Sequence, residues 1–212
     1  MSIFVIILLG FIWYQFISVI GLSIGLHRYF AHNQFKFKYL SSFWETLVLF
    51  LSLLAGSRSP LGWIGAHRIH HRYSDTEKDP HSPLHIGFFN VLFSSWKVKE
   101  IPIKYVRDLY ENKRVMFFHR HWKKIWGITG IISLLISSEF FLIFVVSPFI
   151  FGWSSFGIFN ALGHKDGKPV TNRFINLLSG GEGPHDVHHS NSKQIRLSKY
   201  DISGIIIEKC LK

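Results

Sequence analysis

Histidine is the residue whose number and spacing in this sequence indicate chemistry. The chain contains 13 histidines, and nine of them fall into four short groups. Two of the groups have the spacing HxxHH, which on an α-helix brings positions i, i+3 and i+4 to one face, so their imidazoles are expected to converge. The nine are His27 and His32; His67, His70 and His71; His164; and His185, His188 and His189.

Nine imidazoles are too many for a single metal ion. A structural zinc ion takes four protein ligands and a catalytic one three, often with cysteine among them. The only cysteine here, Cys210, lies outside the histidine groups. Two ions with four or five imidazoles each account for the number, although imidazole binds Fe, Zn, Cu and Ni and so leaves the metal open. A pH-sensitive patch or a nonspecific metal-binding face is the alternative interpretation.

Several histidines and one amide need separate predictions. His27 and His32 are five residues apart and do not share an α-helix face, so we expect them to straddle a helix end and meet through a bend. Asn160, one helical turn before His164, is a candidate to bond a metal-bound water. Ordinary packing roles are expected for three of the four remaining histidines, namely His85, His119 and His121.

The segments that must position these groups are apolar. The chain is 48% hydrophobic yet carries a formal net charge of +11, and the two properties are separated along it. Residues 1–27 contain no Lys, Arg, Asp or Glu, and residues 125–164 contain only Glu139. This separation indicates an integral membrane protein. The N-terminal stretch has no basic beginning and no clear cleavage site, so we interpret it as a retained span rather than a signal peptide.

We predict one domain over residues 1–212, all-α, built as an integral membrane helical bundle with a cytosolic histidine-rich di-metal cap. The distribution of Lys and Arg places the histidine groups at the cytoplasmic face, because positive charge gathers on that side. A basic, aromatic stretch over 97–124 is expected to lie at the membrane surface. The predicted elements are a span at about 3–26, a re-entrant or buried segment at 43–63, a hairpin at 124–163 that turns near residues 137–139, and cytosolic regions at 64–123 and 164–212.

Four motifs together resemble the membrane fatty acyl desaturases of the stearoyl-CoA (Δ9) type. They are GLHRYFAHNQFK, AHRIHHRYSDTEKDPHSP, NALGH and GEGPHDVHH, and the resemblance extends from about Gly21 to Asp201. It implies that the nine histidines bind two Fe²⁺ ions and that Asn160 contacts this centre directly or through water. It also implies O₂, a fatty acyl-CoA or acyl-lipid substrate, and a separate electron donor of the cytochrome b5 or ferredoxin type. The chain departs from the family in beginning with the span before the first histidine group, where relatives commonly have one more. Pro184 and Asp186 stand where an aromatic residue and Asn are common.

The function that the resemblance implies is O₂-dependent desaturation, which introduces a cis double bond at the Δ9 position of an acyl chain. Removing hydrogen from a methylene group requires a cofactor, so we expect no catalytic residues beyond the metal ligands. A di-iron acyl-chain or lipid hydroxylase and a non-catalytic, membrane-bound metal- or lipid-binding remnant are the alternatives. Arg68 and Arg72 are expected to pair with Asp75 or Asp79, and contact with a CoA phosphate or a lipid headgroup is the alternative. The remaining positive charge is assigned to membrane lipid rather than to nucleic acid.

Overall fold

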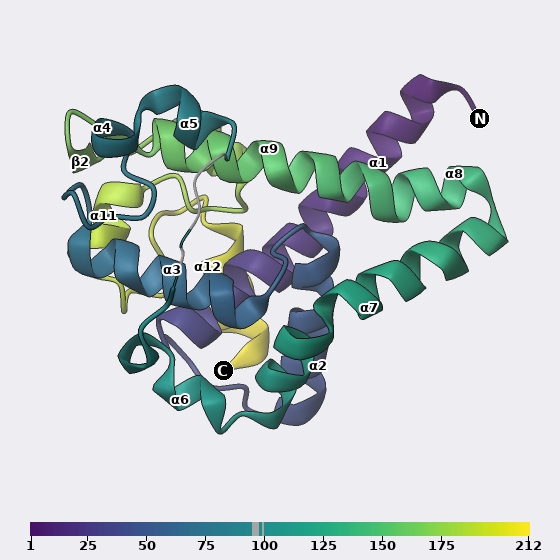
Figure 1. Ribbon diagram of the computed structural model, residues 1–212, viewed down its shortest axis with the longest axis horizontal. Helices are drawn as coiled ribbons and strands as arrows, with labels where there is room; N and C mark the ends of the chain where they lie inside the picture. Colours follow the sequence, from purple (N-terminus) through teal and green to yellow (C-terminus); the bar gives the residue numbers. More distant parts are fainter. Residues whose placement is uncertain (95–97, 99) are drawn as a thin grey trace.

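The computed structural model describes residues 1–94, 98 and 100–212, and the described chain is mostly helical, as predicted. Lys97 and Lys99 of the basic stretch 97–124 lie outside these residues. Figure 1 shows long helices that diverge on one side of the molecule and shorter elements gathered on the other.

The first long helix combines α1 (Ile3–Ile17) with η1 (Ser18–Ala31) in one run of 29 residues. The side chain of Ser2 caps its beginning by accepting a hydrogen bond from the backbone N–H of Val5. Its second half is wound as a π-helix, with i→i+5 hydrogen bonds, a form that is frequent at functional sites. The predicted span 3–26 therefore corresponds to a longer helix that carries His27.

The predicted segment 43–63 consists of α2 (Ser41–Leu54), a turn, and the beginning of α3 (Pro60–Tyr73). Helix α2 packs directly along η1 because Gly21 and Gly25 have no side chains. A Cβ atom at either glycine would lie 2.5 Å from an atom of Ser52 or Val48. The Ser59 side chain and Pro60 then begin α3, as is usual for a helix N-terminus.

The predicted hairpin is formed by α7 (Lys113–Ile136) and by the continuous run of α8 (Ser138–Phe141), η3 (Leu142–Val146) and α9 (Ser147–Leu162). It turns at Ser137, within the predicted residues (Figure 1). Helix α7 begins well before residue 124 because the Asn112 side chain caps it. The runs Ile3–Ala31 and Ser138–Leu162 are both long and apolar enough to cross a bilayer.

The N-terminus and the hairpin turn lie together, because the Met1 amino group is 3.4 Å from the Glu139 carboxylate. Large apolar side chains are exposed along α1 and along the second half of α7. Such continuous apolar surface is unusual for a protein in water and typical of helices that contact lipid.

Short elements make up the rest of the fold. A two-stranded antiparallel hairpin is the departure from the all-α prediction; it pairs His164 with Pro169 and Lys165 with Lys168. It forms because Asp166 and Gly167 both have positive φ and reverse the chain. The short elements are α4 (Pro83–Ile86), α5 (Phe88–Leu92), η2 (Ile103–Tyr105), α6 (Arg107–Tyr110), β1 (His164–Lys165), β2 (Lys168–Pro169), α10 (Arg173–Leu178), α11 (His185–Ser190), α12 (Ile202–Ile206) and η4 (Ile207–Leu211).

A buried apolar core joins η1 to α2, α3 and α7. Each helix contributes fully buried side chains to this core, among them Ile24 of η1, Leu49 of α2, Ile64 of α3 and Val115 of α7. This packing fixes the end of η1 against α3, and these are two of the elements that carry histidine groups.

Candidate metal centre

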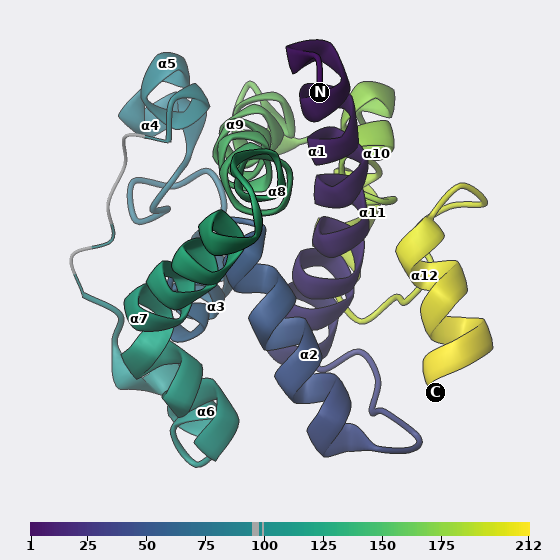
Figure 2. The ribbon, with the colours of Figure 1, turned by 90° about the vertical axis from the view of Figure 1, so that its right-hand side faces the viewer.

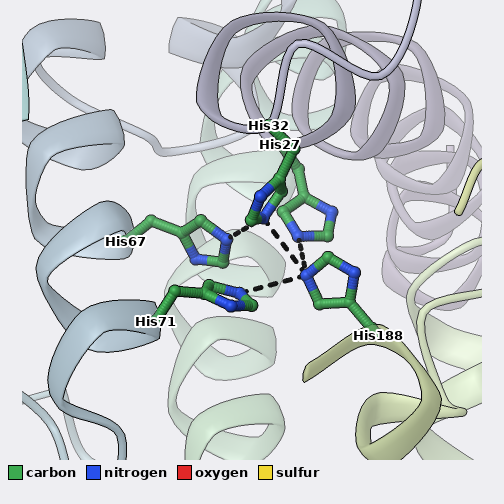
Figure 3. A group of neighbouring side chains, drawn as sticks. All are labelled: His27, His32, His67, His71 and His188. Atoms are coloured by element: carbon green, nitrogen blue, oxygen red, sulfur yellow. Dashed lines mark hydrogen bonds between the residues drawn. The ribbon is translucent and has the colours of Figure 1, made fainter. Parts of the chain in front are cut away.

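Five of the predicted histidines form one cluster, in which their ligand-capable nitrogen atoms all lie within 4.8 Å of one another. Figure 3 shows them entering from three sides, namely from the end of η1, from α3 and from α11. The Nε2 atom of His188 is at the centre, 3.0 Å from Nε2 of His27, 3.0 Å from that of His71 and 3.2 Å from that of His32. The members of this five-histidine cluster are His27, His32, His67, His71 and His188.

The other four predicted histidines form a second cluster beside the first. Nε2 of His185 is 3.0 Å from Nε2 of His164 and 3.1 Å from that of His189, and the latter is 3.3 Å from Nε2 of His70. The rings of His71 and His189, one from each cluster, stack with centroids 4.2 Å apart. The members of this four-histidine cluster are His70, His164, His185 and His189.

Each HxxHH group is divided between the two clusters, so two imidazoles of each group converge as predicted and the third joins the other cluster. In α3, positions i and i+4 join the five-histidine cluster and position i+3 joins the other; in α11 the assignment is reversed. The reason is geometric. Residues i and i+4 are about 40° apart around a helix, whereas i+3 lies about 60° to the other side of i. A helix between two sites can therefore serve both.

His27 and His32 meet through the winding of η1 and not through a bend. The π-helical hydrogen bond from the backbone N–H of His32 to the carbonyl of His27 brings a residue and its fifth neighbour to the same side. Their ring centroids are 4.8 Å apart. His32 does lie at the helix end, as predicted, where it forms the C-cap.

The set of nitrogen atoms fits a bound cation better than a hydrogen-bonded network. A neutral imidazole has one N–H and one lone pair, yet Nε2 of His188 faces three other Nε2 atoms within hydrogen-bond distance. One nitrogen cannot satisfy three such neighbours. Burial, together with the neighbouring imidazoles, also lowers the pKa of His67, His70 and His185 well below the ordinary value. Neutral imidazoles with converging lone pairs are the form that binds metal.

Two aspartates orient histidines of the four-histidine cluster by contacting their Nδ1 atoms, on the side of each ring away from the cluster. Nδ1 of His164 is 2.7 Å from the Asp75 carboxylate, and Nδ1 of His70 is 2.9 Å from both carboxylate oxygens of Asp79. Asp79 also accepts hydrogen bonds from the backbone N–H groups of Asp75 and His81, which fold the loop after α3 around it. A carboxylate on Nδ1 keeps the proton there and directs the Nε2 lone pair into the cluster.

Glu182 has the same role beside the five-histidine cluster. Its Oε1 is 3.2 Å from Nδ1 of His27 and also accepts hydrogen bonds from Ser23 and Arg28. Burial alone would raise the pKa of the Glu182 carboxyl, but the neighbouring Arg28 and His27 hold it well below its usual range. The carboxylate is therefore ionised, although it is almost completely buried.

These three carboxylates were missed as site residues in the sequence. The signal that could have found them is the presence of Asp75, Asp79 and Glu182 inside the two motifs that carry the HxxHH groups. The expected pairing of these aspartates with arginine is wrong, because they face the histidines and Arg68 instead pairs with Asp108 at 2.6 Å.

The remaining histidines lie outside both clusters. His81 was not predicted as a residue near the site. It is buried with its ring centroid 4.1 Å from that of His70, and burial lowers its pKa to about 3. His119 is 2.7 Å from the Ser59 hydroxyl, and His85 is 2.9 Å from the carbonyl of Asp75. His121 contacts the ring of Phe117.

A mostly apolar cavity of about 520 Å³ lies against the five-histidine cluster. His27 and His67 line one part of it, and Asn160 lines it from α9. Helix α9 ends at Leu162, one residue before the predicted end of the hairpin, and His164 begins β1. Further lining side chains come from α1, α7 and α9, among them Tyr14, Trp122, Phe149, Trp153, Phe156 and Phe159.

Replacing Asp79 with asparagine should weaken metal binding by about 10- to 100-fold, the usual effect of losing such a partner. The amide cannot hold the proton on Nδ1 of His70 as the carboxylate does. Metal retained after dialysis against a series of chelator concentrations measures the change. Glu77→Gln, at an exposed position of the same loop, is the matched control and should behave as the unmodified chain does. Equal retention by the two variants would show that Asp79 does not support the site.

Nine imidazoles converging in two adjoining groups, beside a cavity and at the end of two apolar helices, define a histidine-only candidate for a two-metal centre. Comparison with known proteins then shows which proteins this chain is similar to. The chain is similar over most of its length to the fatty acid desaturases, as its motifs indicated. No protein-family model matches it.

Three relatives illustrate the similarity. The sn-1 stearoyl-lipid 9-desaturase of Synechocystis is 28% identical over 202 residues, which are 86% of this chain and 60% of the relative. The Delta-9 acyl-lipid desaturase 2 of Arabidopsis thaliana is 26% identical over 93% of this chain and 69% of its own length. A hex-5-enoyl-[acyl-carrier protein] acetylenase of Moorena producens is 33% identical over 132 residues, 55% of this chain and 39% of the relative. The matched regions thus span 60% of the Synechocystis relative and 39% of the Moorena producens relative.

Proposed function

We propose that this chain is an O₂-dependent fatty acyl desaturase that introduces a cis double bond, at the Δ9 position, into an acyl-CoA or acyl-lipid chain. The observation that carries the proposal is the presence of two adjoining histidine clusters, of which the five-histidine cluster lies against an apolar cavity. The similarity to several proteins named as desaturases supports the reaction type. The position of the double bond rests on the Δ9 relatives among them.

The proposed cofactor is a pair of Fe²⁺ ions. The five-histidine cluster would hold one and the four-histidine cluster the other, with Asn160 positioned to bond a water beside them. Bound iron would supply the power to remove hydrogen from an unactivated methylene, using O₂ and electrons from a separate donor of the cytochrome b5 or ferredoxin type. The balanced reaction consumes one O₂, two electrons and two protons, and it yields one double bond and two waters. The protein's own residues hold the metals, position the chain and exclude water.

The cavity is the proposed binding site for the acyl chain. Its aromatic and aliphatic lining suits a hydrocarbon, and its contact with His27 and His67 brings a bound chain to the edge of the five-histidine cluster. The relatives' names mention carrier-protein, lipid and CoA substrates, so the acyl chain is the feature they share.

The proposed setting is a membrane, with the histidine clusters at the cytoplasmic face. Two helices of sufficient length and apolar character support it. The proximity of Met1 to Glu139 also supports it. The positive-inside rule assigns both the N-terminus and the hairpin turn to the membrane face opposite the histidine clusters, so the two are expected to lie on the same side.

Expression in a host with a simple lipid composition, followed by mass spectrometry of its fatty acids, tests the proposal. A new monounsaturated acid is the expected product, and cleavage at the double bond gives its position. The purified protein should contain close to two irons. A hydroxylated acid would reassign the chain to the hydroxylases. Bound zinc without O₂ consumption in the presence of reductant would indicate a non-catalytic protein.

A further inference from the structure

A buried ionic network extends from the five-histidine cluster to the C-terminal part of the chain. Arg28, with a fully buried side chain, donates through Nε to Glu182 at 2.8 Å and through Nη2 to Asp201 at 3.0 Å. Its Nη1 donates to the carbonyl of Ile195. Since Oε1 of Glu182 also contacts His27, the network connects Asp201 to a histidine of the cluster through two intermediate side chains.

Asp201 itself is fixed by the backbone of the C-terminal segment. Its carboxylate accepts hydrogen bonds from the N–H groups of Leu197 and Gly204, both at 2.8 Å, and the second of these bonds caps α12. Asp201 and Ser203 are fully buried. Figure 2 shows α12 lying beside the α1–η1 helix, on the side away from α7. The segment 195–204 therefore clamps Arg28 from outside the histidine clusters.

The charges in this network explain why the clamp affects the metal site. Two buried carboxylates face one guanidinium, which leaves one negative charge to be compensated. A metal cation bound at the five-histidine cluster would provide the compensation through His27. An unsupported Arg28 would be free to shift, and Glu182 would shift with it, because both of its strong partners use the same oxygen, Oε1. Buried charges in such a chain are costly to leave unpaired.

The four-histidine cluster has separate support. Its partners Asp75 and Asp79 come from the loop after α3, whereas Arg28 donates its hydrogen bonds to Glu182, Asp201 and Ile195. A change at Asp201 should therefore act on one cluster and not on the other.

We propose that Asp201, with the segment 195–204, is a positioning element of the five-histidine metal site, acting on His27 through Arg28 and Glu182. This inference rests on the proposed function, since it assumes that the clusters hold metal. It assigns a role in metal retention to a part of the chain that contains no ligand.

The Asp201→Asn variant tests the inference, with Glu208→Gln as the matched control. Glu208 also lies in the C-terminal part, where it pairs with Arg196 at the surface at 3.8 Å. The proteins are loaded with ⁵⁷Fe²⁺ and dialysed against a series of chelator concentrations. Asp201→Asn should lose one of its two irons at about 10-fold lower chelator concentration, within the range for partners of ligands. Mössbauer spectra should show one ferrous signal weakened and the other unchanged. The control should match the unmodified chain.

A folded Asp201→Asn protein that retains both irons as the unmodified chain does would overturn the inference. If that variant does not fold, Ser23→Ala decides, because Ser23 donates to Glu182 from η1 and its loss removes only a hydroxyl. Ser23→Ala should show the same selective loss in weaker form, and unchanged retention would overturn the inference equally. An unmodified chain that binds no iron would instead contradict the proposed function.

Discussion

Replacing His188 with alanine should abolish metal binding at the five-histidine cluster and reduce desaturation below detection. The effect should be larger than for the other ligands, because Nε2 of His188 faces three partner nitrogens. Its loss opens the centre of the cluster, so the remaining four imidazoles no longer surround one point. Iron content, O₂ consumption and fatty acid analysis of the expressing host measure the outcome.

The same variant should lose much of the stabilisation that metal gives to the fold. A metal present at about 1,000 times its Kd stabilises the native state by about 4 kcal/mol, so the metal-dependent rise in Tm should shrink markedly. His121→Ala is the matched control, since His121 contacts Phe117 and belongs to neither cluster. A His188→Ala protein with two irons and normal product would show that the cluster is not the catalytic centre.

The helical fold and the nine histidines could be predicted because both are local properties of the sequence. Hydrophobic stretches such as 3–26 predict helices by composition, and the HxxHH spacing predicts a shared helix face. The hairpin turn near Ser137 was predictable for the same reason, because polar residues interrupt an apolar run there. The early beginning of α7 was not predicted, because the stretch 97–124 is basic and was assigned to the membrane surface, whereas α7 begins within it at the Asn112 cap.

The division of the histidines into five and four could not be predicted from the sequence. It depends on the orientation of α3 and α11 about two points, and these helices are far apart in the chain. The contacts of the buried carboxylates could not be predicted for the same reason. Asp75 and His164 are separated by 89 residues, and Arg28 and Glu182 by 154. Spacing along the chain contains no information on such pairs, so the local Arg–Asp pairing was the natural but incorrect prediction.

The two clusters differ in how their support is built. The four-histidine cluster takes both carboxylates and one ligand, His70, from α3 and the loop that follows it, whereas its other three ligands come from β1 and α11. The five-histidine cluster takes His27 from η1, His188 from α11 and its clamp from Asp201. Both sites therefore form only when distant segments have packed, but the five-histidine site depends in addition on the proposed support from Asp201. We expect it to be the weaker of the two in variants that loosen the fold.

Replacing Gly62 with leucine should stop turnover while both metals remain bound. Gly62 lies near the beginning of α3 and lines the cavity, where an added Cβ would meet only the side chain of Ser59 within 4 Å. The backbone can therefore accept the change, and leucine favours a helix over glycine by about 1 kcal/mol. The rest of the new side chain would occupy space proposed for the acyl chain. Because misplacement by about 1 Å can cost roughly 100-fold in rate, product should fall by at least about that factor.

Gly127→Leu provides the control for this prediction. Gly127 is also helical, in α7, and a Cβ there would meet nothing within 4 Å. It does not line the cavity, so product, iron content and Tm should all stay close to those of the unmodified chain. Loss of iron in Gly62→Leu would mean that the substitution disturbs α3 and its histidines. Normal product with the metals in place would exclude the cavity as the acyl site, because a bound chain and a leucine cannot share the same volume.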